Sequence, residues 1–205
     1  MDKKTIFFDV ETTGRDCRVY DIIQISLIVD INKKVEETLT LNVRPLNEVY
    51  EVEALKVNGL KWDDILRFQD PKLAYGKIIN MLERHMPFEE RGMYDNRDKF
   101  NICAYNGKKF DIPFLKAFFI KNSDNRINRF FNKVIDPYEF LESQRLLAQT
   151  CGYNFPLKSL KLTSLCELLG IEFEGVAHDA KFDTIALREL VYKLGKIYKP
   201  FKFSS

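Results

Sequence analysis

The sequence predicts an α/β fold in which helices cover a mixed β-sheet. Short runs rich in β-branched and apolar residues dominate residues 1–43, whereas helical spacing of apolar residues dominates the segments after residue 51. The expected order is three strands, helices, a strand, a helix, a strand and further helices, which is typical of a sheet packed between helices. The length of 205 residues suits one domain, so we expect residues 1–205 to form a single unit.

The first three strands are expected to form an antiparallel start to the sheet. The apolar run 5–10 is too short for a helix, 22–30 is rich in β-branched residues, and 34–43 alternates charged residues or threonine with valine and leucine. Short turns such as 30–33 would join these strands. The first three strands therefore lie next to one another along the chain.

The remainder of the chain changes to helical spacing. Residues 51–86 predict several short helices, one of which starts at Pro71 directly after Asp70. Residues 88–100 are expected to be a charged loop, and 122–132 form a polar, basic segment without an assigned element. Further strands are expected at 101–106 and 134–136, and further helices at 111–121, after Pro137, at 158–169 and at 180–197.

Composition excludes several classes of protein. With 45% hydrophobic and 30% charged residues, the chain is expected to be globular, and its net charge of +2 does not by itself demand nucleic acid. The four cysteines form no CxxC pair and only two histidines accompany them, which argues against structural zinc. No signal peptide and no apolar run of about 18 residues is present, so we expect a cytoplasmic protein with free thiols and no membrane segment.

The segment Asp9-Val10-Glu11-Thr12-Thr13-Gly14 follows the first strand and carries the clearest chemical signal. Side chains two apart on a strand share a face, so Asp9 and Glu11 would lie side by side. Two such carboxylates need a counter-charge, and their hard oxygen atoms suit Mg²⁺ or Mn²⁺. Gly14 then permits a turn that a side chain would hinder. The alternative is a strand that ends in an ordinary acidic, polar turn.

Two further acids and a histidine lie near predicted helix starts. Asp111 begins the helix at 111–121, where it would be either a functional group or a helix N-cap. Asp183 would lie one turn inside a helix capped by Asp179, on the face that it shares with Leu187. His178 immediately precedes that helix and could reach the same region; taken alone, it would be interpreted as structural.

In combination, these residues resemble the DEDDh family of 3′–5′ exonucleases, the DnaQ-like enzymes named after the proofreading subunit of bacterial DNA polymerase III. Three segments carry the resemblance: 9–14; Asn106-Gly107-Lys108-Lys109-Phe110-Asp111; and His178-Asp179-Ala180-Lys181-Phe182-Asp183. The resemblance implies a ribonuclease-H-like fold, a five-stranded mixed sheet with helices on both faces, and a catalytic core at about 5–190. Tyr105 departs from the histidine of many relatives, and Asp179 stands where the tyrosine subgroup has Tyr.

The resemblance also implies roles for individual residues. Asp9, Glu11, Asp111 and Asp183 would hold two Mg²⁺ or Mn²⁺ ions, and His178 would take a proton from the attacking water as general base. A softer match at 57–60 would border the terminal nucleotide, although the same residues could be a helix ended by Asn-Gly. The implied substrate-binding residues are Thr12, Thr13, Val57, Asn58, Leu60, Asn106 and Phe110.

The leading hypothesis is a metal-dependent 3′–5′ exonuclease that hydrolyses phosphodiester bonds from the free 3′ end of single-stranded nucleic acid, with DNA favoured. An RNA-trimming exoribonuclease of the same family is an alternative within that class. A non-catalytic module that binds nucleic acid or a polymerase is a second class, and a metal-dependent regulator of the same fold is a third, which the histidine spacing disfavours. A DNA polymerase or another replication or repair protein is a possible partner.

Overall fold

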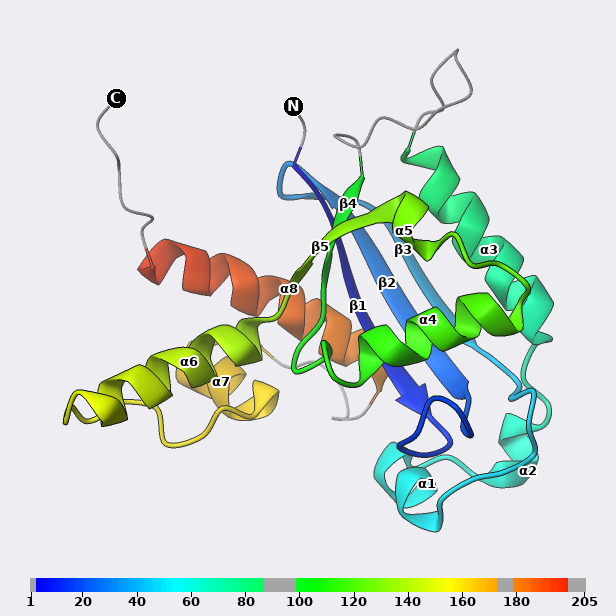
Figure 1. Ribbon diagram of the computed structural model, residues 1–205, viewed down its shortest axis with the longest axis horizontal. Coiled ribbons are helices and arrows are strands. Elements are labelled where there is room, and N and C mark those ends of the chain that lie inside the picture. Colours follow the sequence, from blue (N-terminus) through cyan, green and yellow to red (C-terminus); the bar gives the residue numbers. More distant parts are fainter. Residues whose placement is uncertain (1–2, 87–98, 173–178, 199–205) are drawn as a thin grey trace.

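The computed structural model describes residues 3–86, 99–172 and 179–198 (Figure 1). Its centre is a five-stranded sheet in the order β3-β2-β1-β4-β5. β1 pairs antiparallel with β2 and parallel with β4, so the sheet is mixed, as the sequence predicts. The strands are β1 (Lys4–Thr12), β2 (Ile22–Ile31), β3 (Lys34–Asn42), β4 (Phe100–Cys103) and β5 (Phe131–Ile135).

All helices except α5 occupy regions in which the sequence predicts them. They are α1 (Val52–Asn58), α2 (Trp62–Ile65), α3 (Pro71–Arg84), α4 (Asp111–Lys121), α5 (Ile127–Phe130), α6 (Pro137–Thr150), α7 (Leu162–Leu168) and α8 (Ala180–Ile197). The helix α3 starts at Pro71, and the Asp70 carboxylate accepts a hydrogen bond from the Lys72 amide, which confirms that expected helix start. None of the helices among the described residues is long and apolar enough to cross a membrane.

The turn between β2 and β3 also agrees with the sequence. Asn32 and Lys33 both have positive φ, at 55° and 72°, which suits the tight two-residue turn of a hairpin. The Asp30 carboxylate accepts a hydrogen bond from the Lys33 amide at 2.9 Å and closes the turn. The expected boundary at 30–33 is therefore confirmed.

Several expected boundaries are wrong; β5, for example, covers Phe131–Ile135 and not 134–136. β4 ends at Cys103, not at 106, because the chain turns away from the sheet and Asn106 adopts a φ of 54°. The segment 122–132 contains α5, which the buried Phe130 side chain anchors to the core. α7 covers Leu162–Leu168 and is shorter than the predicted helix at 158–169, because the N-cap, Lys161, is still in an extended conformation.

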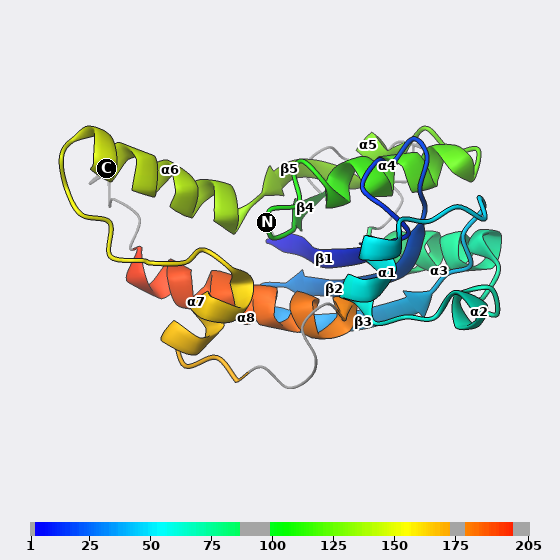
Figure 2. The ribbon, with the colours of Figure 1, turned by 90° about the horizontal axis from the view of Figure 1, so that it is seen from below.

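The two faces of the sheet pack against different helices, as Figure 2 shows edge-on. On β1, Ile6 and Phe8 join the main apolar core with side chains of α3 and α4. Phe7 points to the opposite face and packs near Leu187 of α8. Because side chains alternate along a strand, Asp9 and Glu11 project toward the same face as Phe7, under α8.

A second apolar cluster joins α6, α7 and the middle of α8 at one end of the sheet (Figure 2). Leu141, Leu165 and Leu190, one from each of these helices, are almost fully buried in it. Cys17, Cys103, Cys151 and Cys166 are free thiols, as expected. The expectation that residues 1–205 form a single domain, with a core at about 5–190, stays a prediction.

Candidate active site

Three carboxylates converge on the α8 face of the sheet. One carboxylate oxygen from each of Asp9, Glu11 and Asp183 lies within 4.8 Å of the others. β1 supplies the first two side chains, two residues apart on one face, and the first turn of α8 supplies the third. The juxtaposition that the sequence predicts for these three residues is therefore present in the structure.

The beginning of α8 is fixed to the sheet beside Glu11. The Gln24 side-chain oxygen accepts a hydrogen bond from the Ala180 amide at 2.7 Å, and Gln24 pairs with Glu11 in the β1–β2 register. The Asp179 carboxylate caps the helix through the Lys181 amide, as predicted. Gln24 thus holds the start of α8, which carries Asp183. This role of Gln24 could be found only from the tertiary structure.

Asp111 reaches the same region from the other face of the sheet. It is the first residue of α4, whose N-cap is Phe110, so the alternative reading of Asp111 as an N-cap is wrong. Its carboxylate accepts a hydrogen bond from the Val10 amide at 3.2 Å. A Cβ atom at Gly107 would lie 2.8 Å from Asp111 Oδ2 and 2.3 Å from the Ala104 Cβ, so glycine is required for this close approach.

The electrostatics of Asp9, Glu11 and Asp111 favour a bound cation. Burial, reinforced by the neighbouring carboxylates, raises the pKa of Glu11 to about 8 and that of Asp9 well above its ordinary value. Burial likewise raises the pKa of Asp111 to about 7, although hydrogen bonds from backbone amides act in the opposite direction. In all three groups burial is the main cause, because it penalises the charged form, and the hard oxygen donors fit a divalent metal ion.

A cavity of about 460 Å³, which we call the α1 cavity, opens over the carboxylates beside α1. It is lined by Asp9, Val10, Glu11, Thr12, Gly14, Arg15, Glu53, Ala54, Val57, Asn58, Phe110, Asp111 and Asp183. Four predicted substrate-binding residues thus lie together around it: Thr12, Val57, Asn58 and Phe110. Thr13, Leu60 and Asn106 do not line it.

The match at residues 57–60 proves to be both a helix end and part of the cavity wall. α1 ends at Gly59, which has a left-handed φ of 66°, so the alternative reading as an Asn-Gly helix end is confirmed. The Asn58 side-chain amide donates a hydrogen bond to the Thr12 carbonyl at 3.0 Å. The helix is thereby tied to the end of β1, next to Glu11.

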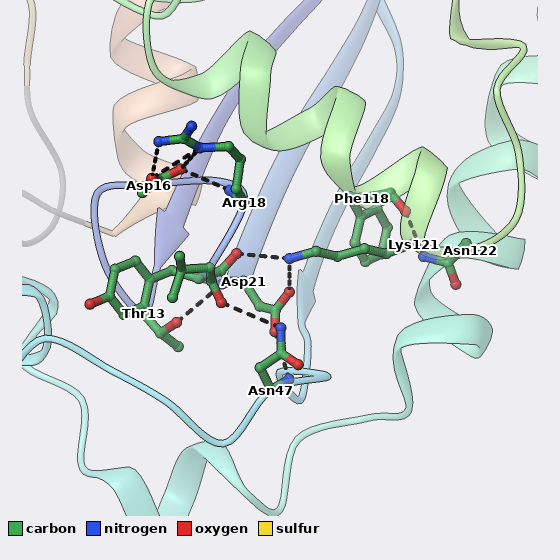
Figure 3. Close-up of polar contacts among 10 residues, drawn as sticks. Thr13, Asp16, Arg18, Asp21, Asn47, Phe118, Lys121 and Asn122 are labelled. Atoms are coloured by element: carbon green, nitrogen blue, oxygen red, sulfur yellow. Dashed lines mark hydrogen bonds and ion pairs between the residues drawn. The ribbon is translucent and has the colours of Figure 1, made fainter.

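The Thr13 side chain stabilises the loop that follows β1 (Figure 3). Its buried hydroxyl accepts a hydrogen bond from the Asp21 amide at 3.1 Å. The Asp21 carboxylate in turn accepts hydrogen bonds from Lys121 Nζ at 2.6 Å and from the Asn47 amide at 2.7 Å (Figure 3). Within this loop, a Cβ at Gly14 would lie 2.4 Å from the Tyr20 ring, so a close approach requires glycine there.

The Asp21–Lys121 pair lies outside the site but connects two of the segments that form it, and the sequence did not indicate it. Lys121 is the last residue of α4, whose first residue is Asp111, so the pair joins the loop after β1 to the helix that carries Asp111. The two residues are 100 positions apart, and neither lies in a recognisable motif. No signal in one sequence would have identified them.

Asn106 lies away from the α1 cavity. Its amide donates a hydrogen bond to the Asp136 carboxylate at 2.9 Å, and the same carboxylate caps α6. Asn106 lines a second cavity of about 560 Å³, which also includes Asp9 and Asp183. Asn106 and Phe110 are therefore on different sides of the carboxylates, and His178 lies outside the described residues.

A family model described as the RNase_H superfamily matches residues 65–182, more than half of the chain. The chain belongs to the RNase_H superfamily. Exonuclease I of E. coli, solved in complex with a dT13 oligonucleotide, has the same fold as this superfamily member, with a TM-score of 0.75 and 20% identity. That match covers 97% of this chain and 42% of the other. The expected ribonuclease-H-like fold is confirmed.

Further relatives extend the likeness. The exonuclease I of Methylocaldum szegediense matches with a TM-score of 0.72 and 23% identity, over 97% of this chain and 41% of that one. The PolC-type DNA polymerase III of Ureaplasma parvum is 24% identical over 199 residues, which are 96% of this chain and 12% of the polymerase. The resemblance of this superfamily member to the DnaQ-like exonucleases is confirmed, and the chain spans only a small part of the curated relatives it matches.

Proposed function

We propose that the protein is a metal-dependent 3′–5′ exonuclease that acts on single-stranded nucleic acid, with DNA favoured. The observation that carries the proposal is the group of Asp9, Glu11 and Asp183, whose oxygens lie within 4.8 Å of one another at the α1 cavity. Burial raises the pKa values of Asp9 and Glu11, and such carboxylates destabilise a protein unless a cation binds, so a purely structural role does not explain the group.

The relatives support the choice of reaction and of substrate. The E. coli exonuclease I that shares this fold has been solved with a DNA oligonucleotide. The PolC-type relatives are DNA polymerases, which makes a polymerase or another replication protein the partner that we propose. A non-catalytic binding module would have no need for the acidic group, and an exoribonuclease remains the alternative within the same chemistry.

We propose Mg²⁺ or Mn²⁺, as two ions, for the metal. Asp9, Glu11 and Asp183 would hold it from the α8 face, and Asp111 from the α4 face. Such ions supply charge neutralisation at the phosphate and lower the pKa of water. The carboxylates would hold the ions in fixed positions, because they come from one strand end and two helix starts and not from free loops.

The α1 cavity would receive the 3′-terminal nucleotide. Phe110 offers it a ring that is held against Phe114, with 4.9 Å between the ring centroids. Thr12 and Asn58 are already joined by a hydrogen bond, so this wall is preformed. Thr13 and Leu60 would act through the backbone and packing around the cavity, since neither lines it.

His178 is proposed as the general base, on the resemblance of its segment alone. Neutral imidazole must accept the proton, so activity should rise with pH through the histidine's titration. His178→Ala should lower turnover by roughly 10²- to 10⁴-fold and leave manganese affinity nearly unchanged. pH profiles of the wild type and the variant, each with magnesium and with manganese, test this role. A variant with the same rising limb and a loss of only a few-fold would show that the base lies elsewhere.

The decisive test of the proposed function uses matched DNA and RNA oligomers labelled at the 5′ end, with magnesium or manganese. Progressive shortening from the 3′ end is expected, with faster loss of DNA than of RNA. A 3′-phosphate should block the reaction, and a paired 3′ end should slow it. Rapid cutting of a circular single strand would show that the exonuclease assignment is wrong.

A further inference from the structure

We propose that the cavity between α6, α7 and the turn after β4 holds the body of the nucleic-acid strand upstream of the bond that is cut. We call it the α6–α7 cavity; its distinctive lining residues are Tyr105, Asn106, Tyr138, Arg145, Lys161 and Thr163. This inference rests on the proposed exonuclease function and adds the direction in which the strand crosses the site.

The first argument is position. Asp9 and Asp183 line both the α1 cavity and the α6–α7 cavity, so these carboxylates lie where the two cavities meet. A phosphodiester placed at these carboxylates joins one nucleotide to the rest of the strand. The nucleotides on its two sides therefore need separate spaces, and the two cavities provide them.

The second argument is charge. Among the described residues, the charged side chains that line the α6–α7 cavity besides the shared carboxylates are Arg145 and Lys161. In the same part of the chain, the α1 cavity instead adds three carboxylates, Glu11, Glu53 and Asp111, and one cation, Arg15. The strand body carries one phosphate at every linkage, whereas the terminal nucleotide brings only the linkage that is cut. Cations bind phosphates, so the α6–α7 cavity suits the strand body and the α1 cavity suits the terminal nucleotide.

The third argument is that the walls of the α6–α7 cavity are preformed. The Tyr105 hydroxyl donates a hydrogen bond to the Leu160 carbonyl, which holds the segment before α7 against the turn after β4. The rings of Tyr105 and Tyr138 contact each other edge to face, with centroids 5.9 Å apart. Two fixed aromatic rings beside two cations are the combination that proteins use to hold a single strand without regard to sequence.

The two cations differ in how tightly they are held. Arg145 forms an ion pair with Glu142 on the same helix at 2.6 Å, so its guanidinium is oriented before any substrate arrives. Lys161 is exposed, and within the described part of the chain no ion pair involves it. Lys161 is therefore the residue whose charge can be removed with the least disturbance of the fold.

The test compares Lys161→Gln with Lys72→Gln, a control that removes the same charge from an exposed position in the first turn of α3. The substrates are 5′-labelled twelve-residue oligo-dT strands with normal linkages, or with uncharged methylphosphonates at the second and third linkages from the 3′ end. KM and kcat are measured over a range of salt concentrations. Fluorescence anisotropy in EDTA measures binding without turnover.

We expect Lys161→Gln to raise KM several-fold on the normal strand, leave kcat nearly unchanged, and flatten the logarithmic salt dependence by about 0.7, the value for one lost contact to a single strand. It should have no effect on the strand with neutral linkages. Arg145→Gln should also raise KM and flatten the salt dependence on the normal strand. Lys72→Gln should change neither KM nor the salt dependence. The anisotropy measurements should show the same pattern.

Equal effects of Lys161→Gln on the charged and the neutral strand, or effects no larger than those of Lys72→Gln, would overturn this assignment of the cavity. Such a result would leave the exonuclease proposal standing, because the wild type would still shorten the strands. A wild type that shortens neither strand would overturn the exonuclease proposal instead, and the binding measurements would then decide the cavity assignment without turnover.

Discussion

The two faces of the sheet differ in what they bury. The face under α3 and α4 carries the large apolar core, to which β1 contributes Ile6, Phe8 and Val10. The face under α8 has a much smaller apolar cluster, in which Phe7 is the only β1 residue, and the same face then carries Asp9 and Glu11. Neighbouring residues of β1 therefore have different roles: Ile6, Phe8 and Val10 stabilise the fold, and Asp9 and Glu11 form part of the proposed metal site.

This division explains how the chain tolerates a group of acids with raised pKa values. The apolar side chains that stabilise the sheet are concentrated on the opposite face, where the carboxylates do not disturb them. Asp111 is the exception, because it comes from α4 on the core face and reaches the site only past the end of β1. Substitutions on the two faces should therefore separate stability from activity.

The sharpest comparison is between Asp9→Asn and Phe8→Ala, at adjacent positions of β1. Asp9→Asn should lower activity by more than about 100-fold, beyond the 10–100-fold typical of groups that only support a metal ligand, and should weaken manganese binding. Phe8 is fully buried, so Phe8→Ala should lower the free energy of unfolding by about 3–5 kcal/mol. Calorimetric titration and chemical denaturation measure the two effects. Unchanged manganese binding in Asp9→Asn would contradict the metal-site assignment.

Lys121→Met tests the connection between the core face and the site. It removes the cation that pairs with the buried Asp21 carboxylate, which should cost about 1–3 kcal/mol of stability. It should also lower kcat/KM, because the loop that carries Gly14 loses its attachment to α4. Lys121→Arg should restore part of both. Lys116→Met, at an exposed position of α4, is the control, and an equal loss there would argue against a specific role for the pair.

Phe110→Ala tests whether a residue of the core face also serves the substrate. Phe110 is half-buried against the main core and also lines the α1 cavity, so it is placed both to pack in the core and to contact substrate. A ring that stacks on a base contributes roughly 1–3 kcal/mol of binding. We expect a higher KM in a folded variant with a modest loss of stability. A variant that loses stability but keeps the wild-type KM would limit Phe110 to packing.

The pH dependence of stability should distinguish acids whose pKa is raised by burial, such as Glu11, from acids whose pKa is lowered by hydrogen bonds, such as Asp124. In EDTA the folded protein holds protons on Glu11, whose pKa is about 8, after the unfolded chain has lost them, so stability should fall as pH rises from about 4.5 to 8. Hydrogen bonds from Arg126 lower the pKa of Asp124 instead, so its contribution is lost as pH falls below its ordinary range.

Melting curves across this range measure both effects. Glu11→Gln should reduce the decline above pH 4.5, whereas Asp63→Asn, an exposed acid on α2, should leave it unchanged. Added manganese should remove most of the decline in the wild type. A wild-type protein whose stability in EDTA does not change between pH 5 and 8 would contradict the raised pKa of Glu11.

The sequence by itself predicted most of the elements and the placement of Asp9 and Glu11 on one face, because both depend on local periodicity. Alternation along β1 places two carboxylates on one face whatever surrounds them, and the Asp179 cap places Asp183 one turn inside α8. Asp111 was named only through the resemblance of segment 106–111, because its place at a helix start is equally compatible with an N-cap. α5 was missed because its four residues form a helix only through the buried Phe130.

Only the tertiary structure decided which of these groups meet and from which side. It separates Asn106 from Phe110, although they are four residues apart, because the turn after β4 brings the first to α6 and the second to α1. It also pairs Asp21 with Lys121 and ties Gln24 to the start of α8. These contacts join segments about 100 or more residues apart, and their partners are chosen by the packing of helices on the sheet, a property that no local pattern in the chain encodes.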